Sequence, residues 1–222
     1  MTIKDTAAKP KLNVDESIYQ RSRPIGANVL FNAIRSASIT HVITVPDTHQ
    51  RTLLELLANS PEPKLITVCT EDEAIGINAG LYTGGARPIL LIQNNGFYAC
   101  LNTLKAIPLD AQVPTLMLIG EHGRDLARPS RNNADLSVRM LEPTLEVWGI
   151  PYYRLEGPED MVNFESAFRQ WAEQGGPVAV LVGAPTSLEQ PNSISRSPSP
   201  VMLSETPSVD DIKSVGGHKE KS

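Results

Sequence analysis

The feature that most constrains this 222-residue chain is an alternation of short apolar runs with amphipathic helical stretches. The apolar, β-rich runs are His41–Val45, Leu65–Cys69, Pro88–Ile92, Thr115–Ile119, Pro151–Leu155 and Val178–Val182. Most are apolar at successive positions, which is typical of parallel strands that are covered on both faces. We therefore predict an α/β fold, a doubly wound, six-stranded parallel sheet with helices on both faces.

Caps and turn residues mark the helices between these runs. Ser22 is a candidate N-cap and Pro24 suits a first helical turn, so we predict that the first helix opens here. A second helix is expected to stop at Asn59-Ser60-Pro61. The last helix is expected to open at Gly157-Pro158 and to carry a stripe of large apolar side chains, namely Met161, Phe164, Phe168 and Trp171.

Composition divides the chain into three parts. Residues 1–20 are polar and mixed in charge, and we predict a flexible N-terminal arm there. Residues 21–186 form the predicted domain. Residues 187–222 hold nine Ser, four Pro and no aromatic residue. They lack the apolar surface that would offset the entropy cost of ordering, so we predict a disordered tail.

Charge and residue usage exclude several classes of function. A net charge of −5 gives no electrostatic footprint for nucleic acid. No signal peptide and no apolar run of roughly 20 residues is present, so we expect a cytoplasmic protein that does not bind membranes. Cys69 and Cys100 lie in apolar stretches and are expected to be buried thiols in a reducing compartment. The histidines have no ligand-like spacing, so a zinc site is not expected.

Polar loops follow four of the predicted strands, at residues 46–49, 70–73, 93–96 and 120–125. In doubly wound sheets the chemistry gathers beyond the carboxyl ends of the strands, where these loops must lie. Each loop also has a purely structural explanation: Asn-Gly is a strong turn former, and the loop at 120–125 could be an ordinary surface loop. The cluster of Arg124, Arg128 and Arg131 would suit an anionic ligand, or could be an unremarkable charged surface.

The loop at 70–73 carries three acids at the start of a helix. Acids are favoured at this position by the helix dipole, and Thr70 with Glu73 forms a capping box, so all three acids could be structural. The box nevertheless leaves Glu71 free at the junction of strand and helix. Gly76 and Gly80 lie one turn apart on the same helix, where another helix or a flat ligand could approach closely.

At these residues the chain resembles a known family. The segment from Thr70 to Tyr82, followed by Arg87-Pro88, is similar to the pyrimidine-binding (Pyr) domain of thiamine diphosphate enzymes, in which an acid precedes a glycine by nine positions. Glu71 and Gly80 have that spacing. Further segments resemble sulfopyruvate decarboxylase α-subunits and phosphonopyruvate decarboxylases, and together the likeness covers residues 25–185. These segments are residues 45–47, 91–96, 118–123 and 145–155.

The resemblance implies a thiamine diphosphate-dependent 2-oxo acid decarboxylase. In this family the helix glutamate hydrogen-bonds N1′ of the aminopyrimidine ring and so promotes formation of the ylid that attacks the 2-oxo acid before CO2 leaves. By matching position Glu71 takes this catalytic and cofactor-binding role. The resemblance places Asn94, Asn95 and Gly96 in the cofactor pocket. It leaves Asp47, His49 and His122 as candidates on the substrate side.

The resemblance also implies a partner. The family binds the diphosphate and Mg²⁺ through a second domain that carries Gly-Asp-Gly, a motif absent from this sequence. We therefore expect a second subunit with that motif, the Mg²⁺ ligands on that subunit, and a hetero-oligomer of α2β2 form or larger. The relatives carry Arg-Gly where this chain has His122-Gly123. The implied substrate is a small anionic 2-oxo acid, with sulfopyruvate and phosphonopyruvate as the leading candidates.

Two other hypotheses stand beside this one. The chain could be a non-catalytic regulatory or partner-binding subunit that retains the Pyr fold, although Glu71 argues against that. It could also be a flavodoxin-like binder of another cofactor, which the absorption spectrum of the purified protein would reveal.

Overall fold

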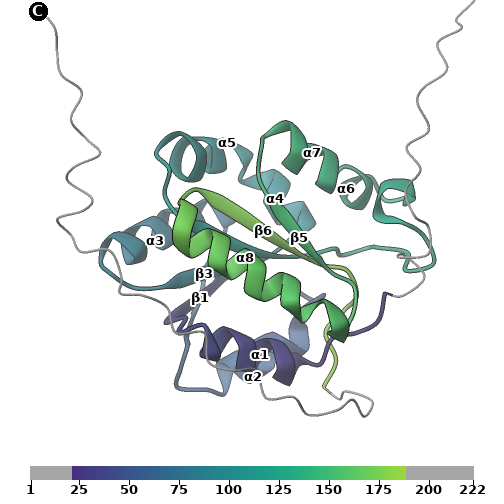
Figure 1. Ribbon diagram of the computed structural model, residues 1–222, viewed down its shortest axis with the longest axis horizontal. Helices are drawn as coiled ribbons and strands as arrows, with labels where there is room; N and C mark the ends of the chain where they lie inside the picture. The colour runs from purple at the N-terminus through teal and green to yellow at the C-terminus, as the bar shows by residue number, and fades with distance from the viewer. Residues whose placement is uncertain (1–21, 189–222) are drawn as a thin grey trace, which may run out of the picture.

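The computed structural model describes residues 22–188, which form a parallel sheet with helices on both faces (Figure 1). The six strands are β1 (His41–Thr44), β2 (Lys64–Thr67), β3 (Pro88–Gln93), β4 (Thr115–Gly120), β5 (Tyr152–Leu155) and β6 (Pro177–Val182). Their order in the sheet is β2-β1-β3-β4-β6-β5. The predicted fold class is confirmed. The predicted arm at residues 1–20 and all but the first two residues of the predicted tail lie outside the described residues.

The helices form two layers. One face is covered by α1 (Ala27–Ser36), α2 (Arg51–Ala58) and α8 (Met161–Gln174), which crosses in front of the sheet in Figure 1. The other face is covered by α3 (Glu71–Thr83), α4 (Asn94–Ala99), α5 (Leu101–Leu104) and α7 (Leu141–Val147). The short elements are η2 (Lys105–Asp110), η3 (Ser130–Asn132), α6 (Leu136–Arg139) and η4 (Pro158–Asp160).

Neighbouring residues of one strand enter opposite cores, which explains the uninterrupted apolar runs. In β3, Ile89 and Leu91 pack with α1, α2 and α8, whereas Leu90 and Ile92 pack with α3, α4 and α5. All four side chains are fully buried. An alternating polar position in such a strand would place a polar side chain in one of the two cores, so only apolar residues suit both faces.

The strand order places a crevice at the carboxyl end of the sheet. β1 lies between β2 and β3, so the chain leaves β1 toward one side of the sheet and returns on the other. At such a reversal the loops that follow the two strands diverge and leave room for a ligand. The loop that begins at Val45 and the polar segment that begins at Gln93 meet at this point.

The prediction that Ser22 caps the first helix is wrong. Helix α1 begins at Ala27 with Gly26 as its N-cap, because the residues before it are extended. The backbone N–H of Arg23 donates to Glu156 O (2.6 Å), and the Ser22 hydroxyl donates to the Glu156 carboxylate. Ser22 therefore fastens the start of the domain to the end of β5.

The prediction of two buried thiols is half correct. Cys100 is fully buried between α4 and α5, and burial raises its pKa to about 12. Cys69 is exposed, because β2 is an edge strand and ends at Thr67 before the cysteine is reached. None of the helices in residues 22–188 is both long and apolar enough to cross a membrane.

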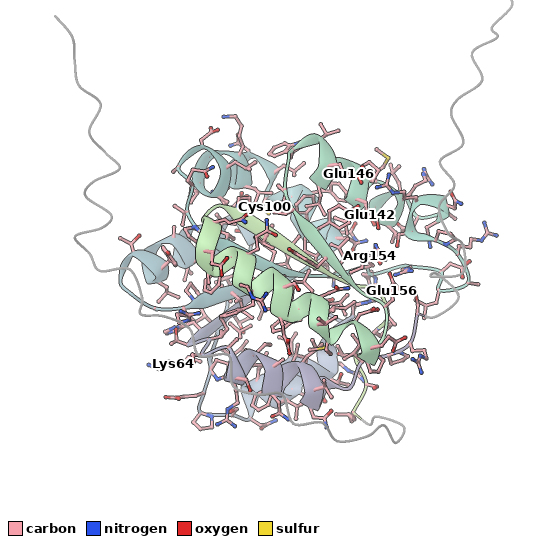
Figure 2. All side chains as sticks on the ribbon, viewed as in Figure 1. Lys64, Cys100, Glu142, Glu146, Arg154 and Glu156 are labelled. Carbon is pink, nitrogen blue, oxygen red and sulfur yellow. The ribbon has the colours of Figure 1, made fainter. Side chains whose placement is uncertain are left out.

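A network of charged side chains lies beside the carboxyl ends of β4, β5 and β6. Arg154 on β5 and Arg124 after β4 share the carboxylates of Glu121 and Glu156. Arg124 Nη1 lies 2.7 Å from Glu121 Oε2 and 2.8 Å from Glu156 Oε2. Arg154 also pairs with Glu142 on α7, and Figure 2 shows these partners along one edge of the domain.

This network overturns the interpretation of the arginine cluster as an anion site. Arg124 is paired internally and its side chain is fully buried. Arg131 pairs with Glu142 and Glu146, and Arg128 pairs with Asp125 at the surface. Their partners come from residues up to 32 positions away, which spacing along the sequence does not reveal.

The charges of this network also lower the pKa of Glu156. Burial by itself would raise the pKa of Glu156, but the neighbouring charges of Arg154 and Arg124 outweigh burial and lower it. A carboxyl group whose pKa is lower in the folded state than in the unfolded state stabilises the fold at pH values above its unfolded-state pKa, which is about 4.3 for glutamate. This stabilisation is lost as the pH falls through the pKa of the folded state.

We expect Arg154→Met to lower the free energy of unfolding by about 3–5 kcal/mol, because it leaves buried carboxylates without their cation. Urea unfolding at neutral pH measures this difference. The control is Arg128→Met, which removes an exposed pair and should cost less than about 1 kcal/mol. The difference between wild type and Arg154→Met should narrow below about pH 4.3 as the carboxylates protonate. Equal stability of the two variants at neutral pH would contradict a structural role for this network.

Candidate functional site

The first group of candidate residues follows β1. Asp47 is buried, with a relative exposure of 2%. Its Oδ1 accepts a hydrogen bond from the backbone N–H of His49 (2.7 Å), and its Oδ2 accepts one from Gln50 Nε2 (3.1 Å). Burial raises the pKa of Asp47, and the hydrogen bonds it receives oppose that rise. This loop therefore holds a carboxylate in a fixed orientation at the crevice.

His49 is fixed by a backbone carbonyl on β6. Its Nε2 lies 2.9 Å from Val182 O, which can only accept, so Nε2 carries the proton and Nδ1 is unprotonated in the neutral ring. Burial lowers the pKa of His49 and favours that neutral ring. Gly120 at the end of β4 makes room for this group, since a Cβ there would lie 2.7 Å from Asp47 Oδ2 and 3.0 Å from His49 Cδ2.

His122 lies in the loop after β4 and is exposed. Its Nδ1 is 3.5 Å from the hydroxyl of Thr48, so the loops after β1 and β4 meet here. Asn94 holds the backbone of this loop, because its Nδ2 donates to His122 O (3.0 Å) and to Ser137 Oγ (3.0 Å). The Asn94 amide is thus used within the chain, while Asn95 is exposed beside it.

The acids at the start of α3 have different partners. Thr70 is the N-cap and accepts from Glu73 N (3.2 Å), as the capping box predicts. Glu73 Oε2 accepts from the backbone N–H of Cys69 (3.0 Å), one residue before the expected donor. Asp72 accepts from the hydroxyl of Thr103 on α5. Two of the three acids are therefore structural.

Glu71 differs from the other two acids at the start of α3. Within residues 22–188, neither a hydrogen bond nor an ion pair engages its half-buried carboxylate. The carboxylate rests on the backbone of Gly96 in α4, where a Cβ would lie 2.0 Å from Glu71 Oε1. A carboxylate at a helix N-terminus, held in a cradle that only glycine leaves open, is positioned to accept a hydrogen bond from a ligand.

The structure places the predicted residues along one edge of the sheet in two groups. Glu71 contacts Gly96, whereas Asp47 and His49 lie with Gly120, and Thr48 bridges to His122. Helix α4 links the groups, because Asn94 at its first position fastens the loop that carries His122. The sequence analysis missed Gln50 and Gly120. A glycine at the end of a buried strand was the available signal for Gly120, whereas Gln50 had no signal in the sequence.

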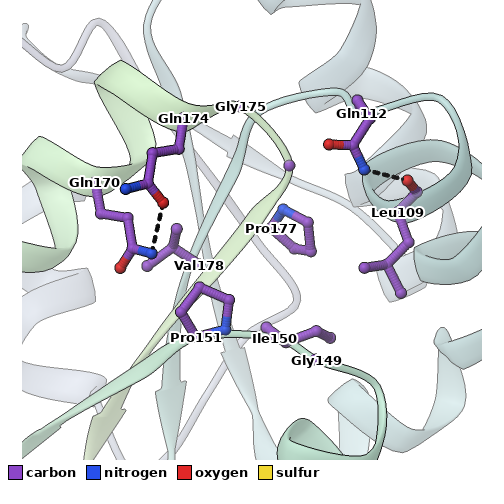
Figure 3. Close-up of a pocket in the computed structure, with 11 residues that line it drawn as sticks. Leu109, Gln112, Gly149, Ile150, Pro151, Gln170, Gln174, Gly175, Pro177 and Val178 are labelled. Atoms are coloured by element: carbon purple, nitrogen blue, oxygen red, sulfur yellow. Dashed lines mark hydrogen bonds between the residues drawn. The ribbon is translucent and has the colours of Figure 1, made fainter.

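A separate pocket of ≈ 480 Å³ lies at the opposite, amino-terminal edge of the sheet (Figure 3). It is lined by the starts of β5 and β6, the end of α8 and the loop near Gln112, and none of its lining residues is ionisable. None of the candidate residues lines it. Within residues 22–188, His, Cys, Asp and Glu side chains do not gather in any group of three or more that could hold a metal ion.

The Gly76 and Gly80 face of α3 is open in the described chain. Both glycines are exposed, and a Cβ built on either would have no atom within 4 Å. Residues 22–188 therefore do not use the close approach that the sequence allows on this face.

The chain is similar to several known proteins. The chain is 29% identical to the sulfopyruvate decarboxylase subunit alpha of Methanocaldococcus jannaschii over 72% of this chain and 94% of that protein. It is 28% identical to the phosphonopyruvate decarboxylase of Streptomyces viridochromogenes over 45% of this chain and 25% of that protein. The fold also matches the crystal structure of benzoylformate decarboxylase from Polynucleobacter necessarius, with a TM-score of 0.57 and 18% identity over 80% of this chain and 33% of that one.

One family model matches more than half of the chain. Its description is thiamine pyrophosphate enzyme, N-terminal TPP binding domain, and the match runs from residue 25 to residue 139. This range includes every candidate residue described above, from Asp47 to His122. The chain therefore belongs to the thiamine pyrophosphate enzymes and contains their N-terminal, cofactor-binding domain.

Proposed function

We propose that this chain is the pyrimidine-binding subunit of a thiamine diphosphate-dependent decarboxylase that acts on a small anionic 2-oxo acid. The observation that carries the proposal is the Glu71 carboxylate, which rests on Gly96 at the start of α3 and has no hydrogen-bond partner within residues 22–188. Similarity to sulfopyruvate decarboxylase α-subunits over most of their length supports the choice of reaction.

The residues at this edge fit the aminopyrimidine end of the cofactor. When bound, thiamine diphosphate supplies the electron sink that accepts the bonding electrons as CO2 leaves. Glu71 would accept a hydrogen bond from a protonated ring nitrogen and hold that proton in place. The missing Cβ of Gly96 leaves room for the carboxylate to take this position. Asn95 and the backbone at Gly96 would line the same part of the pocket.

Asp47, His49 and His122 form the substrate side of the proposed site. Arg124, Arg131 and Arg154 are neutralised by glutamates, so none of them is free to meet the substrate's charge. His122 is exposed at the crevice, and its ring N–H can donate a hydrogen bond to an anionic group. Asp47, held by His49 N–H and Gln50, would face the carboxylate that leaves as CO2.

A second subunit completes the proposed enzyme. The relatives that this chain matches over 94% of their length are themselves named as alpha subunits. The sequence lacks Gly-Asp-Gly, and residues 22–188 hold no cluster of metal-ligating side chains. In the proposed assembly the partner supplies the diphosphate site and its Mg²⁺, and Glu71 meets the pyrimidine ring at the boundary between the two polypeptides.

We expect Glu71→Gln to lower the rate of CO2 release by the assembled complex by at least about 10²-fold. The uncharged amide of glutamine stabilises a proton on the ring nitrogen of the cofactor less well than a carboxylate does. Turnover is measured with the partner present, and size-exclusion chromatography checks that the complex still forms. The matched control is Asp72→Asn, an acid-to-amide change one residue away, at a side chain whose only hydrogen-bond partner within residues 22–188 is Thr103. A Glu71→Gln complex with near-native turnover would refute the assignment.

We expect Gly96→Ala to reproduce the loss of turnover, because the new Cβ would lie 2.0 Å from Glu71 Oε1 and displace the carboxylate. The comparison variant is Gly76→Ala, where a Cβ meets no atom of the described chain within 4 Å. That change should stabilise the isolated chain by about 0.5–1 kcal/mol in thermal unfolding, as expected for alanine in a helix interior. Full activity of the Gly96→Ala complex would show that the position of Glu71 is unimportant.

Reconstitution separates an enzyme from a regulatory subunit. We expect the chain alone to release no CO2, and the chain mixed with its Gly-Asp-Gly partner, thiamine diphosphate and Mg²⁺ to decarboxylate sulfopyruvate or phosphonopyruvate faster than pyruvate. The assay follows CO2 release across this panel of 2-oxo acids. If the partner alone were as active as the mixture, the chain would be a non-catalytic subunit.

A further inference from the structure

Gln50 is a buried amide whose orientation is fixed by three oxygen atoms. It lies at the start of α2, and its side chain is fully buried. Its Nε2 faces Asp47 Oδ2 at 3.1 Å, Leu118 O at 3.4 Å and Ile92 O at 3.5 Å. Turning the amide over would point Oε1 at all three acceptors, so only one orientation is compatible with these surroundings. Gln50 is therefore a fixed donor to Asp47.

Stability of the fold does not account for this amide. Its Oε1 is buried and has no hydrogen-bond partner within residues 22–188, which is costly for folding. The bonds from Nε2 to the two backbone carbonyls are long, and only the bond to Asp47 has ordinary length. A leucine would fill nearly the same volume without the buried, unsatisfied oxygen. The hydrogen bond to Asp47 is the feature that only the amide provides.

We propose that Gln50 is a positioning residue for the reaction, one that fixes the orientation of the Asp47 carboxylate and stabilises its ionised form. This inference rests on the proposed function, in which Asp47 lies on the substrate side of the site. Gln50 holds Oδ2 while the His49 N–H holds Oδ1, so the carboxylate is gripped at both oxygens.

The other groups around Asp47 do not replace Gln50. Gln93, at the end of β3, also lowers the pKa of Asp47, but its effect is smaller than that of Gln50. His49 lies on the same loop, but burial favours its neutral ring and its Nε2–H is committed to Val182 O. Glu121 and His122 approach from the loop after β4, and the Glu121 carboxylate is itself paired with Arg124 and Arg154. Burial raises the pKa of Asp47, and the hydrogen bonds donated to its two oxygens limit that rise.

The test replaces Gln50 and follows the titration of Asp47. In Gln50→Leu the loss of a donor to a charged group should raise the pKa of Asp47 by about one pH unit. The measurement is ¹³C NMR of Asp side-chain carboxyls in the full chain, with Asp47→Asn used to assign the signal. Gln50→Glu keeps the shape of the side chain and places a second carboxyl beside Asp47, so it should raise the pKa further.

The matched control is Asn78→Leu on α3. Asn78 is also fully buried, and its Nδ2 donates to Thr115 Oγ1 (3.0 Å) and Pro114 O (3.1 Å). Its Oδ1 likewise has no hydrogen-bond partner in the described part of the chain. The Asn78 side chain lies beside the start of β4, whereas Asp47 lies near the opposite, carboxyl end of that strand. The control should leave the titration of Asp47 unchanged, even where it destabilises the chain as much as Gln50→Leu does.

A second measurement uses the complex with its partner. In Gln50→Leu the acid limb of the plot of kcat/KM against pH should shift to higher pH by the same amount as the pKa of Asp47 measured by NMR. Activity should recover as the pH is raised. Identical Asp47 titrations in wild type and in both Gln50 variants would overturn the role of Gln50. Wild-type turnover by an Asp47→Asn complex would instead overturn the role of Asp47 in the proposed function, so the two failures are distinguishable.

Discussion

All six strands run in the same direction, the central strands β1, β3, β4 and β6 are buried on both faces, and the positions of the functional groups follow from this constraint. Parallel strands end at one edge, so the loops after β1, β3 and β4 meet although 70 or more residues separate the first from the last. The reversal at β1 opens the crevice between them. Both faces of the sheet are apolar, so polar groups gather at this edge, where Asp47, Gln93 and His122 are found.

The charges at this edge are divided between structure and chemistry. Arg124 and Arg154 are used to neutralise buried glutamates and thereby tie β5 and α7 to the loop that carries His122. Buried carboxylates need such partners, because an unpaired charge in a core is strongly destabilising. The consequence for the proposed function is that recognition of an anionic substrate falls to His122, to backbone N–H groups and to the partner subunit, rather than to arginine.

The start of α3 shows how neighbouring residues of one type acquire different roles. Glu73 completes the cap, Asp72 reaches Thr103, and Glu71 has no partner within residues 22–188. Helix geometry turns successive residues by about 100°, so three adjacent acids point in three directions. Only the direction of Glu71 leads to a glycine that leaves room for the carboxylate and for a ligand. The same reasoning applies to Gln50, whose role comes entirely from the oxygens that surround it.

The sequence by itself determined the strands, most of the helices, the parallel sheet, the Thr70 cap and the resemblance to the Pyr domain, because burial on two faces and local capping leave a periodic signal along the chain. Only the tertiary structure decided that Ser22 fastens β5 rather than capping α1, that Cys69 is exposed, and that the arginines after β4 are neutralised. These outcomes depend on which distant segment lies alongside. Strand order sets that neighbourhood, and pairings such as Arg124 with Glu156 therefore carry no signature in local spacing.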